Sequence, residues 1–277
     1  EAKLIGAVTL DATDTDFVTI TVDDTSSDLH VDGAFAADNV VTFSLVSTDG
    51  GIIDFDSTGL ATADLMTTFS ASTTDGTDAA DITFGSFAIG GTVAAAKLTT
   101  IDLDASHGGD ITTGSFDAAG ATLTSITMDS ATTGSVIDIG GAVTADSVTN
   151  ITTTAVSGGS VDFSGALVIS TVGTMKHTGA GNFTADSASN AIVSLERLDL
   201  TGATGTNTVD ISGNTNAVTI NLGAGTNNIL LTGAADDVNL SSTAATDTLT
   251  LQAVDGVVPV ISSFAFASGA DVISVDL

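Results

Sequence analysis

The hydrophobic positions of this chain recur with a period of about 25 residues, which is in the range of solenoid repeats. A motif of the form apolar-x-x-apolar-x-apolar begins at Leu98, Leu123, Val148, Val172 and Leu195, in steps of 25, 25, 24 and 23. The second half of each motif alternates apolar and polar residues, which is typical of a strand with one buried face. We therefore expect Ile101 and Leu103 to point inward and Asp102 to point outward. Stacking of the coils should place the first residues of the five motifs in one interior column: Leu98, Leu123, Val148, Val172 and Leu195.

A second series of short apolar runs interleaves with the first and is centred on Ile111, Ile137, Val161, Phe183 and Val209. Two strand series with a common period indicate a solenoid, in which each turn pairs with the backbone of its neighbours. The sequence therefore predicts an all-β fold, a parallel β-helix or β-roll with coils of about 25 residues. A leucine-rich repeat is the alternative, since it shares the L-x-x-L-x-L pattern, but the Gly-flanked strand at 158–165 argues against it.

Toward the C-terminus the period tightens to about 20 residues per coil. A pattern of Asn or Asp, any residue and an aliphatic residue begins at Asn207, Asn216, Asn227, Asp236 and Asp247, in steps of 9, 11, 9 and 11. Two steps make one coil, so Asn207, Asn227 and Asp247 are expected to stack on one side, and Asn216 and Asp236 on the other. We divide the chain into an irregular β region at 1–95 (more solenoid or a β-sandwich cap), a β-helix at 96–206, and a β-roll with its closing segment at 207–277.

Three segments resemble a known family. The run NLGAGTNNI at 221–229 resembles a degenerate unit of the calcium-binding nonapeptide G-G-x-G-x-D-x-U-x of repeats-in-toxin (RTX) proteins. The run SLERLDLTGATG at 194–205 resembles β-helical stretches of bacterial surface-layer (S-layer) proteins with such repeats, and 261–277 is similar to their closing segment and to a type I secretion signal. The resemblance covers about residues 95–277 and implies a secreted, calcium-binding surface-layer protein.

The resemblance also implies metal ligands. In the family the glycines turn carbonyls toward Ca²⁺ and the Asp ligates it, which points here to Gly223, Gly225, Asn227, Asp236 and Asp247. Asn replaces Asp in three of the five units, so a ladder of stacked Asn amides is the alternative to calcium. Ca²⁺ accepts about six to eight oxygen ligands, and the candidate set is completed by Asp23, Asp24 and Asp271.

The composition limits the classes of molecule that this chain can bind. The chain has 34 acidic and 4 basic residues, a formal net charge of −30, and 32 of the acids are Asp. Such a chain repels nucleic acid and attracts cations, although an acidic surface that only maintains solubility is the alternative. The absence of Cys excludes disulfides and thiolate catalysis. No apolar run approaches the length of about 20 residues that a membrane-spanning helix needs, so we expect no transmembrane segment.

We expect no enzymatic activity. His30, His107 and His177 are far apart, and the chain lacks Trp and Tyr, which β-helix enzymes use to bind polysaccharides. Such an enzyme is the remote alternative. The sequence instead favours an extracellular structural protein that assembles with copies of itself into a cell-surface layer or filament, with calcium bridging acidic faces and linking them to cell-surface polysaccharide. An adhesin or matrix module that binds a receptor or glycan is the main alternative.

Overall fold

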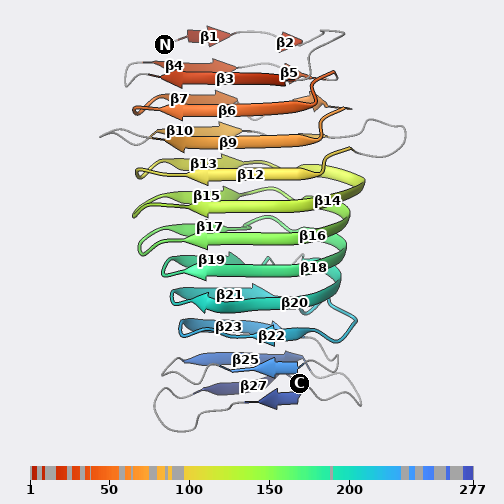
Figure 1. The fold of residues 1–277 in the computed structure, drawn as a ribbon. Helices are drawn as coiled ribbons and strands as arrows, with labels where there is room; N and C mark the ends of the chain where they lie inside the picture. The colour runs from red at the N-terminus through yellow and green to blue at the C-terminus, as the bar shows by residue number, and fades with distance from the viewer. Residues whose placement is uncertain are drawn as a thin grey trace.

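The chain forms a parallel β-solenoid, shown by a computed structural model (Figure 1). The structure describes residues 2–4, 8–9, 17–23, 27–31, 35–37, 39–55, 60–63, 65–74, 80–84, 87–88, 97–187, 190–231, 237–240, 246–252, 260–262 and 271–276. Their strands form a 12-stranded and a 15-stranded sheet. Within each sheet, neighbouring strands pair in parallel. The predicted parallel β-helix is confirmed, and two sheets in place of one exclude the leucine-rich repeat.

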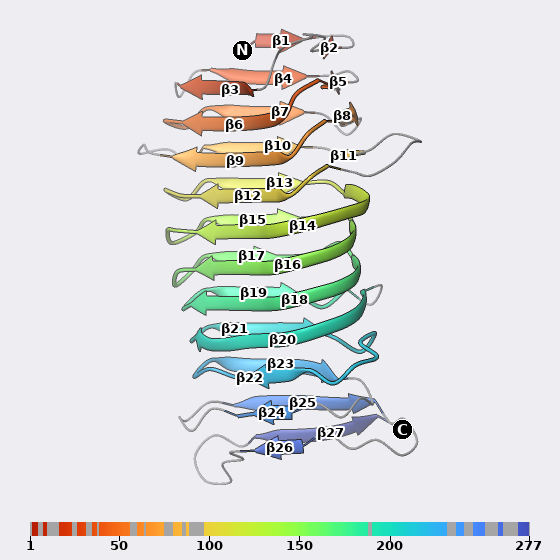
Figure 2. The same ribbon diagram turned by 45° about the vertical axis from the view of Figure 1, so that its right-hand side comes forward.

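Along the chain, one strand of the 12-stranded sheet is followed by one or two strands of the 15-stranded sheet. The 12-stranded sheet contains β1 (Ala2–Leu4), β4 (Asp28–Val31), β7 (Ile52–Phe55), β10 (Asp81–Phe84), β13 (Asp110–Thr113), β15 (Val136–Ile139), β17 (Ser160–Asp162), β19 (Asn182–Ala185), β21 (Thr206–Asp210), β23 (Thr226–Leu231), β25 (Asp247–Gln252) and β27 (Val272–Asp276). The 15-stranded sheet contains β2 (Val8–Thr9), β3 (Phe17–Asp23), β5 (Phe35–Ala36), β6 (Thr42–Thr48), β8 (Leu60–Thr62), β9 (Thr68–Thr74), β11 (Phe87–Ala88), β12 (Thr100–Ala105), β14 (Phe116–Ser130), β16 (Val143–Ala155), β18 (Leu167–Gly179), β20 (Ala191–Ala203), β22 (Thr219–Asn221), β24 (Asp237–Asn239) and β26 (Val260–Ser262). Seen from a second direction, the two sheets lie back to back along the stack, and β14, β16, β18 and β20 curve around one side of it (Figure 2).

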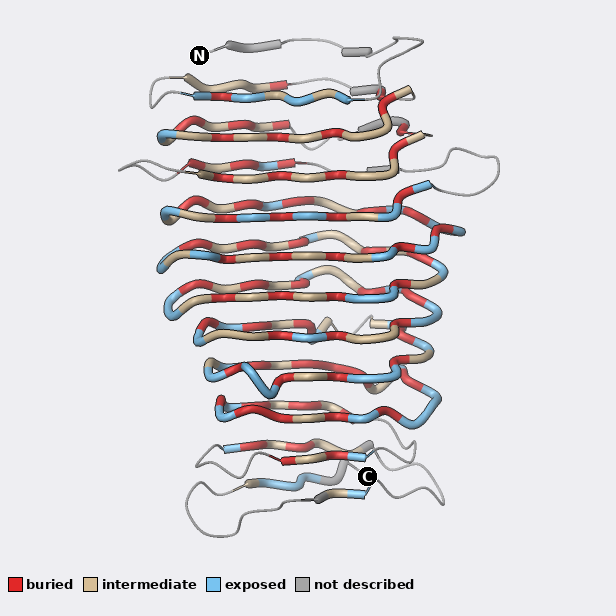
Figure 3. Tube along the Cα trace, viewed as in Figure 1, coloured by how far each residue is buried: buried red, intermediate tan, exposed pale blue. Residues whose placement is uncertain are grey.

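The predicted interior column exists. Leu123, Val148, Val172 and Leu195 pair in register from β14 to β20, and each is at most 1% exposed. The alternation within one motif is also as predicted, because Ile101 and Leu103 are buried and Asp102 is exposed. Buried and more exposed residues alternate in the same way along most strands (Figure 3). The core therefore lies between the two sheets, and its buried residues run from Val22 to Leu249.

The same coil continues on both sides of the predicted β-helix. The strands β4, β7 and β10 lie in the 12-stranded sheet, and β3, β6 and β9 lie in the 15-stranded one, so the two sheets pass through the region 1–95. At the other end, Asn207, Asn227 and Asp247 pair with the expected step of 20. The opposite sheet differs, because Asn221 pairs with Asn239, a step of 18. Turns vary in length while the strands stay stacked, so coil length need not agree on both sides.

The core side chains change along the stack. In the coils around Phe69 the core holds large rings. Phe69 lies 6.2 Å from Phe43, 5.5 Å from Phe84 and 5.6 Å from Phe116 between ring centroids. Toward the C-terminus the core contains aliphatic residues such as Ile220 and Ile229.

Replacing a residue of a second interior column, formed by Ile126, Ile151 and Met175, should destabilise the solenoid much more than replacing its outward neighbour. Ile151 is fully buried between Ile126 and Met175, whereas Thr152 faces outward on the same strand. We expect Ile151→Ala to lower the free energy of unfolding by about 2–5 kcal/mol and Thr152→Ala to change it little. Urea denaturation followed by circular dichroism measures both, and equal midpoints for the two variants would contradict the column.

Candidate functional site

A buried polar ladder interrupts the hydrophobic column of the 12-stranded sheet. Asn207, Asn227 and Asp247 occupy facing positions on β21, β23 and β25 and are 0%, 0% and 1% exposed. Asn207 Nδ2 donates to Asn227 Oδ1 at 2.8 Å, and Asn227 Nδ2 donates to Asp247 Oδ1 at 2.7 Å. The preceding strands carry apolar residues in the same column: Ile111, Ile137, Val161 and Phe183.

The ladder has a direction that follows from its chemistry. An amide both donates and accepts, so an Asn side chain can accept a hydrogen bond from one adjacent coil and donate one to the other. A carboxylate only accepts, so the series of donations along the column ends at Asp247. Low polarity around these hydrogen bonds makes each of them stronger than the same bond in water. The sequence left two alternatives for these positions, calcium ligands and a ladder of stacked amides. The ladder accounts for the side-chain geometry of Asn207 and Asn227.

The two glycines predicted to belong to a calcium site, Gly223 and Gly225, contact the same ladder. The carbonyl oxygens of Gly223 and Gly225 accept from Asn227 Nδ2 at 3.3 and 3.1 Å. Neither glycine has a positive φ, so neither position needs glycine for a left-handed backbone. Close packing of neighbouring coils requires glycine instead, because a Cβ on Gly223 would meet the carbonyl oxygen of Leu200 and one on Gly225 that of Gly205.

The remaining predicted ligands do not gather into one site. Asp271 lies one coil beyond the ladder and accepts from the backbone N of Asp247 at 3.3 Å. Asp23 is exposed at the end of β3, toward the opposite end of the stack, and accepts from the Thr48 hydroxyl at 2.6 Å (Figure 1). Asp24 and Asp236 lie outside the described residues. Within the described part of the chain, no group of three or more His, Cys, Asp or Glu side chains is placed to hold a metal ion.

The structure brings other carboxylates together on the outer faces. Asp104 pairs with Asp129 between β12 and β14, with Asp102 two positions before Asp104. Burial raises the pKa of Asp102 and of Asp104, and the charge of Asp129 raises both further. On the other sheet, Asp138 pairs with Asp162 between β15 and β17. The alternation places each Asp outward from sequence alone, but the facing pairs follow only from the register between coils.

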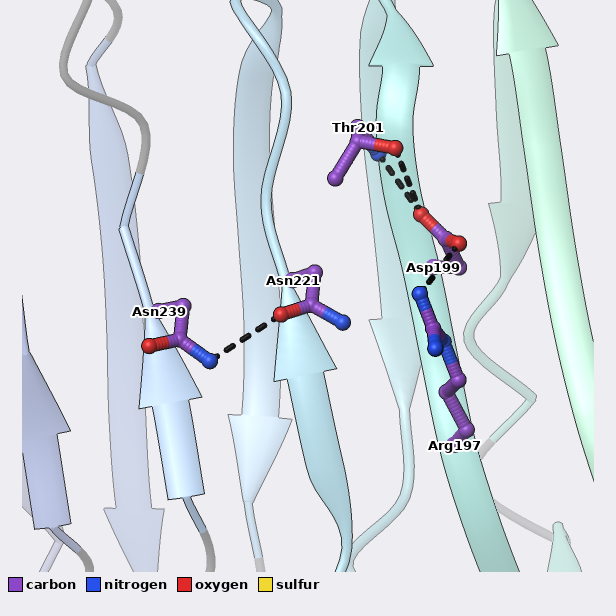
Figure 4. A network of polar contacts seen from close by, with 5 residues as sticks. All are labelled: Arg197, Asp199, Thr201, Asn221 and Asn239. Atoms are coloured by element: carbon purple, nitrogen blue, oxygen red, sulfur yellow. Dashed lines mark hydrogen bonds and ion pairs between the residues drawn. The ribbon is translucent and has the colours of Figure 1, made fainter.

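Few carboxylates of the described residues lie beside a basic side chain. An ion pair joins Arg197 to Asp199 at 2.8 Å, and His30 Nδ1 lies 3.2 Å from Asp54 Oδ2, a contact that is an ion pair only when His30 is protonated. Partial burial raises the pKa of Asp199, but hydrogen bonds from Thr201 and Arg197 outweigh it and leave that pKa below its usual value. Figure 4 shows this cluster beside a second amide pair, in which Asn239 Nδ2 donates to Asn221 Oδ1 at 3.0 Å.

One histidine is built into the core. His177 is 0% exposed, its Nδ1 lies 2.8 Å from the Thr153 hydroxyl, and its ring stacks on Phe183 with centroids 5.0 Å apart. Burial lowers the pKa of His177 to about 4, against an opposing backbone hydrogen bond at Gly181. His177 is therefore neutral at neutral pH and packs as an aromatic ring.

Breaking the ladder should cost far more than removing the adjacent outward amide. Asn227→Ala leaves Asn207 Nδ2 and Asp247 Oδ1 without their buried partner, whereas Asn228→Ala acts on the partly exposed face. We expect Asn227→Ala to lower the free energy of unfolding by about 2–4 kcal/mol, and Asn228→Ala by much less. Urea denaturation of both variants measures the difference, and an equal loss would contradict a ladder that stabilises the core.

His177 should make stability depend on pH. Its pKa rises from about 4 in the fold to the usual 6.5 on unfolding, so the unfolded chain binds more protons between these values. Stability should fall by up to about 3 kcal/mol as the pH drops from 6.5 to 4. His177→Met removes this contribution while it keeps an apolar side chain in place. Thermal melts across this range should show a steeper loss in the native protein than in the variant, and parallel curves would contradict the assignment.

No helix in the described ranges is long and apolar enough to cross a membrane. Comparison with protein-family models, with curated protein sequences and with solved structures finds no match for this chain. A functional assignment therefore depends on the fold, the ladder and the outward charges described above.

Proposed function

We propose that the protein is a structural module that assembles with copies of itself into a cell-surface layer or an extracellular filament, with calcium ions joining their acidic faces. The observation that supports this most directly is the facing of outward carboxylates on both sheets, Asp104 with Asp129 and Asp138 with Asp162. Export by type I secretion belongs to the same proposal and is supported by the sequence resemblance of residues 261–277.

The carboxylate pairs suit an ion shared between molecules. Neighbouring strands are about 4.8 Å apart, so one ion can contact a side chain on each strand. Ca²⁺ needs about six to eight oxygens, and within the described part of the chain no three-carboxylate group supplies them. An ion held by Asp138 and Asp162 therefore has open positions, which the carboxylates of a second copy can fill.

Electrostatics favours the same arrangement. At a net charge of −30, two copies repel each other unless counterions gather between them. The raised pKa values of Asp102 and Asp104 mark a place where the charged form is already disfavoured by burial and by Asp129. A divalent cation relieves this repulsion and joins the faces in one step. Rigid coils, paired through two sheets, provide the stiffness that a layer or filament requires.

Assembly should therefore depend on calcium. We expect purified protein to form sheets or filaments in millimolar Ca²⁺, visible by negative-stain microscopy, and to return to single particles in EDTA. The variant Asp138→Asn/Asp162→Asn should need several times more Ca²⁺ for half-maximal assembly by light scattering. The control Asp117→Asn/Asp146→Asn removes the same charge from two exposed positions that do not face each other. Dispersed particles at all Ca²⁺ concentrations, or equal shifts in both variants, would contradict the proposal.

A further inference from the structure

A hollow of about 260 Å³ lies on the outer face of the 12-stranded sheet, over β21, β23 and β25. Its lining combines carboxylates, hydroxyls, an amide and aliphatic groups from Asp186, Thr208, Val209, Asp210, Asn228, Ile229, Leu230, Thr248 and Thr250. Pockets that enclose drug-sized ligands are larger, about 300–1,000 Å³. The hollow therefore suits a ligand of a single ring, or one unit of a chain that passes over the sheet.

The register places the lining in two adjacent columns. Thr208, Asn228 and Thr248 face one another across β21, β23 and β25, and Asp210, Leu230 and Thr250 form the next column. Asp186 follows Ala185, which pairs with Val209, so the carboxylates of Asp186 and Asp210 come from adjacent coils. One column is thus a row of neutral hydrogen-bonding groups, and the other runs from two acids to an aliphatic side chain and a hydroxyl.

Asp210 is the most constrained polar group of the hollow. It is 8% exposed, although it belongs to an outward column, and its Oδ1 accepts from the backbone N of Ser212 at 2.8 Å. This bond fixes the orientation of the carboxylate and leaves Oδ2 as an acceptor for a ligand. Asp186 is exposed at the rim and supplies a second acceptor.

We propose that this hollow binds one unit of a neutral saccharide. Sugar hydroxyls are donors that match the carboxylates of Asp186 and Asp210, and the Thr hydroxyls and the Asn228 amide both donate and accept. Leu230 offers an apolar surface for the C–H face of a ring. The two carboxylates and the net charge of −30 repel uronates and other acidic sugars. The hollow should therefore bind neutral sugar units in preference to acidic ones.

The affinity of a single hollow should be low, because the chain has no Trp or Tyr to stack on a sugar ring. Many copies held side by side multiply weak contacts with a polymer, since each bound unit raises the effective concentration of the next. The binding site itself does not depend on assembly, and it would operate in the single molecule as well as in a layer.

A saccharide array tests the proposal directly. Fluorescent beads that each carry many copies of the protein, so that weak contacts add up, are applied in EDTA to printed oligosaccharides of glucose, galactose, mannose and N-acetylglucosamine, with oligouronates as the charged comparison. We expect retention on at least one neutral saccharide and none on uronates, with a millimolar Kd by titration calorimetry. Asp210→Asn keeps an acceptor for Ser212 and loses only the charge, and Asp186→Asn acts at an exposed position; each should weaken binding about tenfold. Asp138→Asn, on the same sheet outside the hollow, should bind like the native protein.

Three results would overturn the assignment: no retention on any neutral saccharide, equal binding by uronates, or unchanged affinity in both Asp186→Asn and Asp210→Asn. Binding that requires Ca²⁺ would also overturn it, because the hollow would then be a cation site. Because the array is run in EDTA, failure of calcium-dependent assembly leaves this result intact, and failure of saccharide binding leaves the assembly proposal intact.

Discussion

The parallel backbone ladder between coils is the constraint on which the rest of this structure depends. Each strand of one coil hydrogen-bonds to the equivalent strand of the next, about 4.8 Å away, so paired side chains lie over one another except at a few register shifts. Each residue of a column must therefore be compatible with the paired residues of the two adjacent coils. Aliphatic residues, Phe and hydroxyl residues satisfy this condition by contact, and Asn satisfies it because its amide donates to one neighbour and accepts from another.

The buried ladder shows how a polar group can replace an apolar one in such a column. A lone Asn between aliphatic residues would lose its hydrogen bonds to water without replacement. Asn227 avoids this cost because it accepts from Asn207 and donates to Asp247. Asn207 avoids only part of it, because its Nδ2 donates to Asn227 while its Oδ1 is buried without a hydrogen-bond partner. The glycines at the same turn matter through the close approach of neighbouring coils, and their carbonyls add acceptors for Asn227.

Stacking has the opposite effect on charges. Carboxylates that recur at one outward position face each other at the strand spacing, as Asp104 faces Asp129, and they repel. The fold tolerates this because the pairs lie at the surface, where solvent and counterions screen them. The same repulsion makes the outer faces attractive to divalent cations, and hydroxyl-rich columns beside them, such as the one through Thr208 and Thr248, offer hydrogen bonds to uncharged ligands.

The sequence by itself determined the all-β class, the coil period and the inward column from Leu123 to Leu195. These features recur in every coil of that region, so the pattern remains visible even where one copy deviates from it. It also determined that Asn207, Asn227 and Asp247 would stack. Only the tertiary structure decided that Gly223 and Gly225 pack against carbonyls, that Asp138 faces Asp162, and that Asp186 meets Asp210 in one hollow. These contacts depend on turn lengths, which differ from coil to coil and set the register between residues that no local pattern relates.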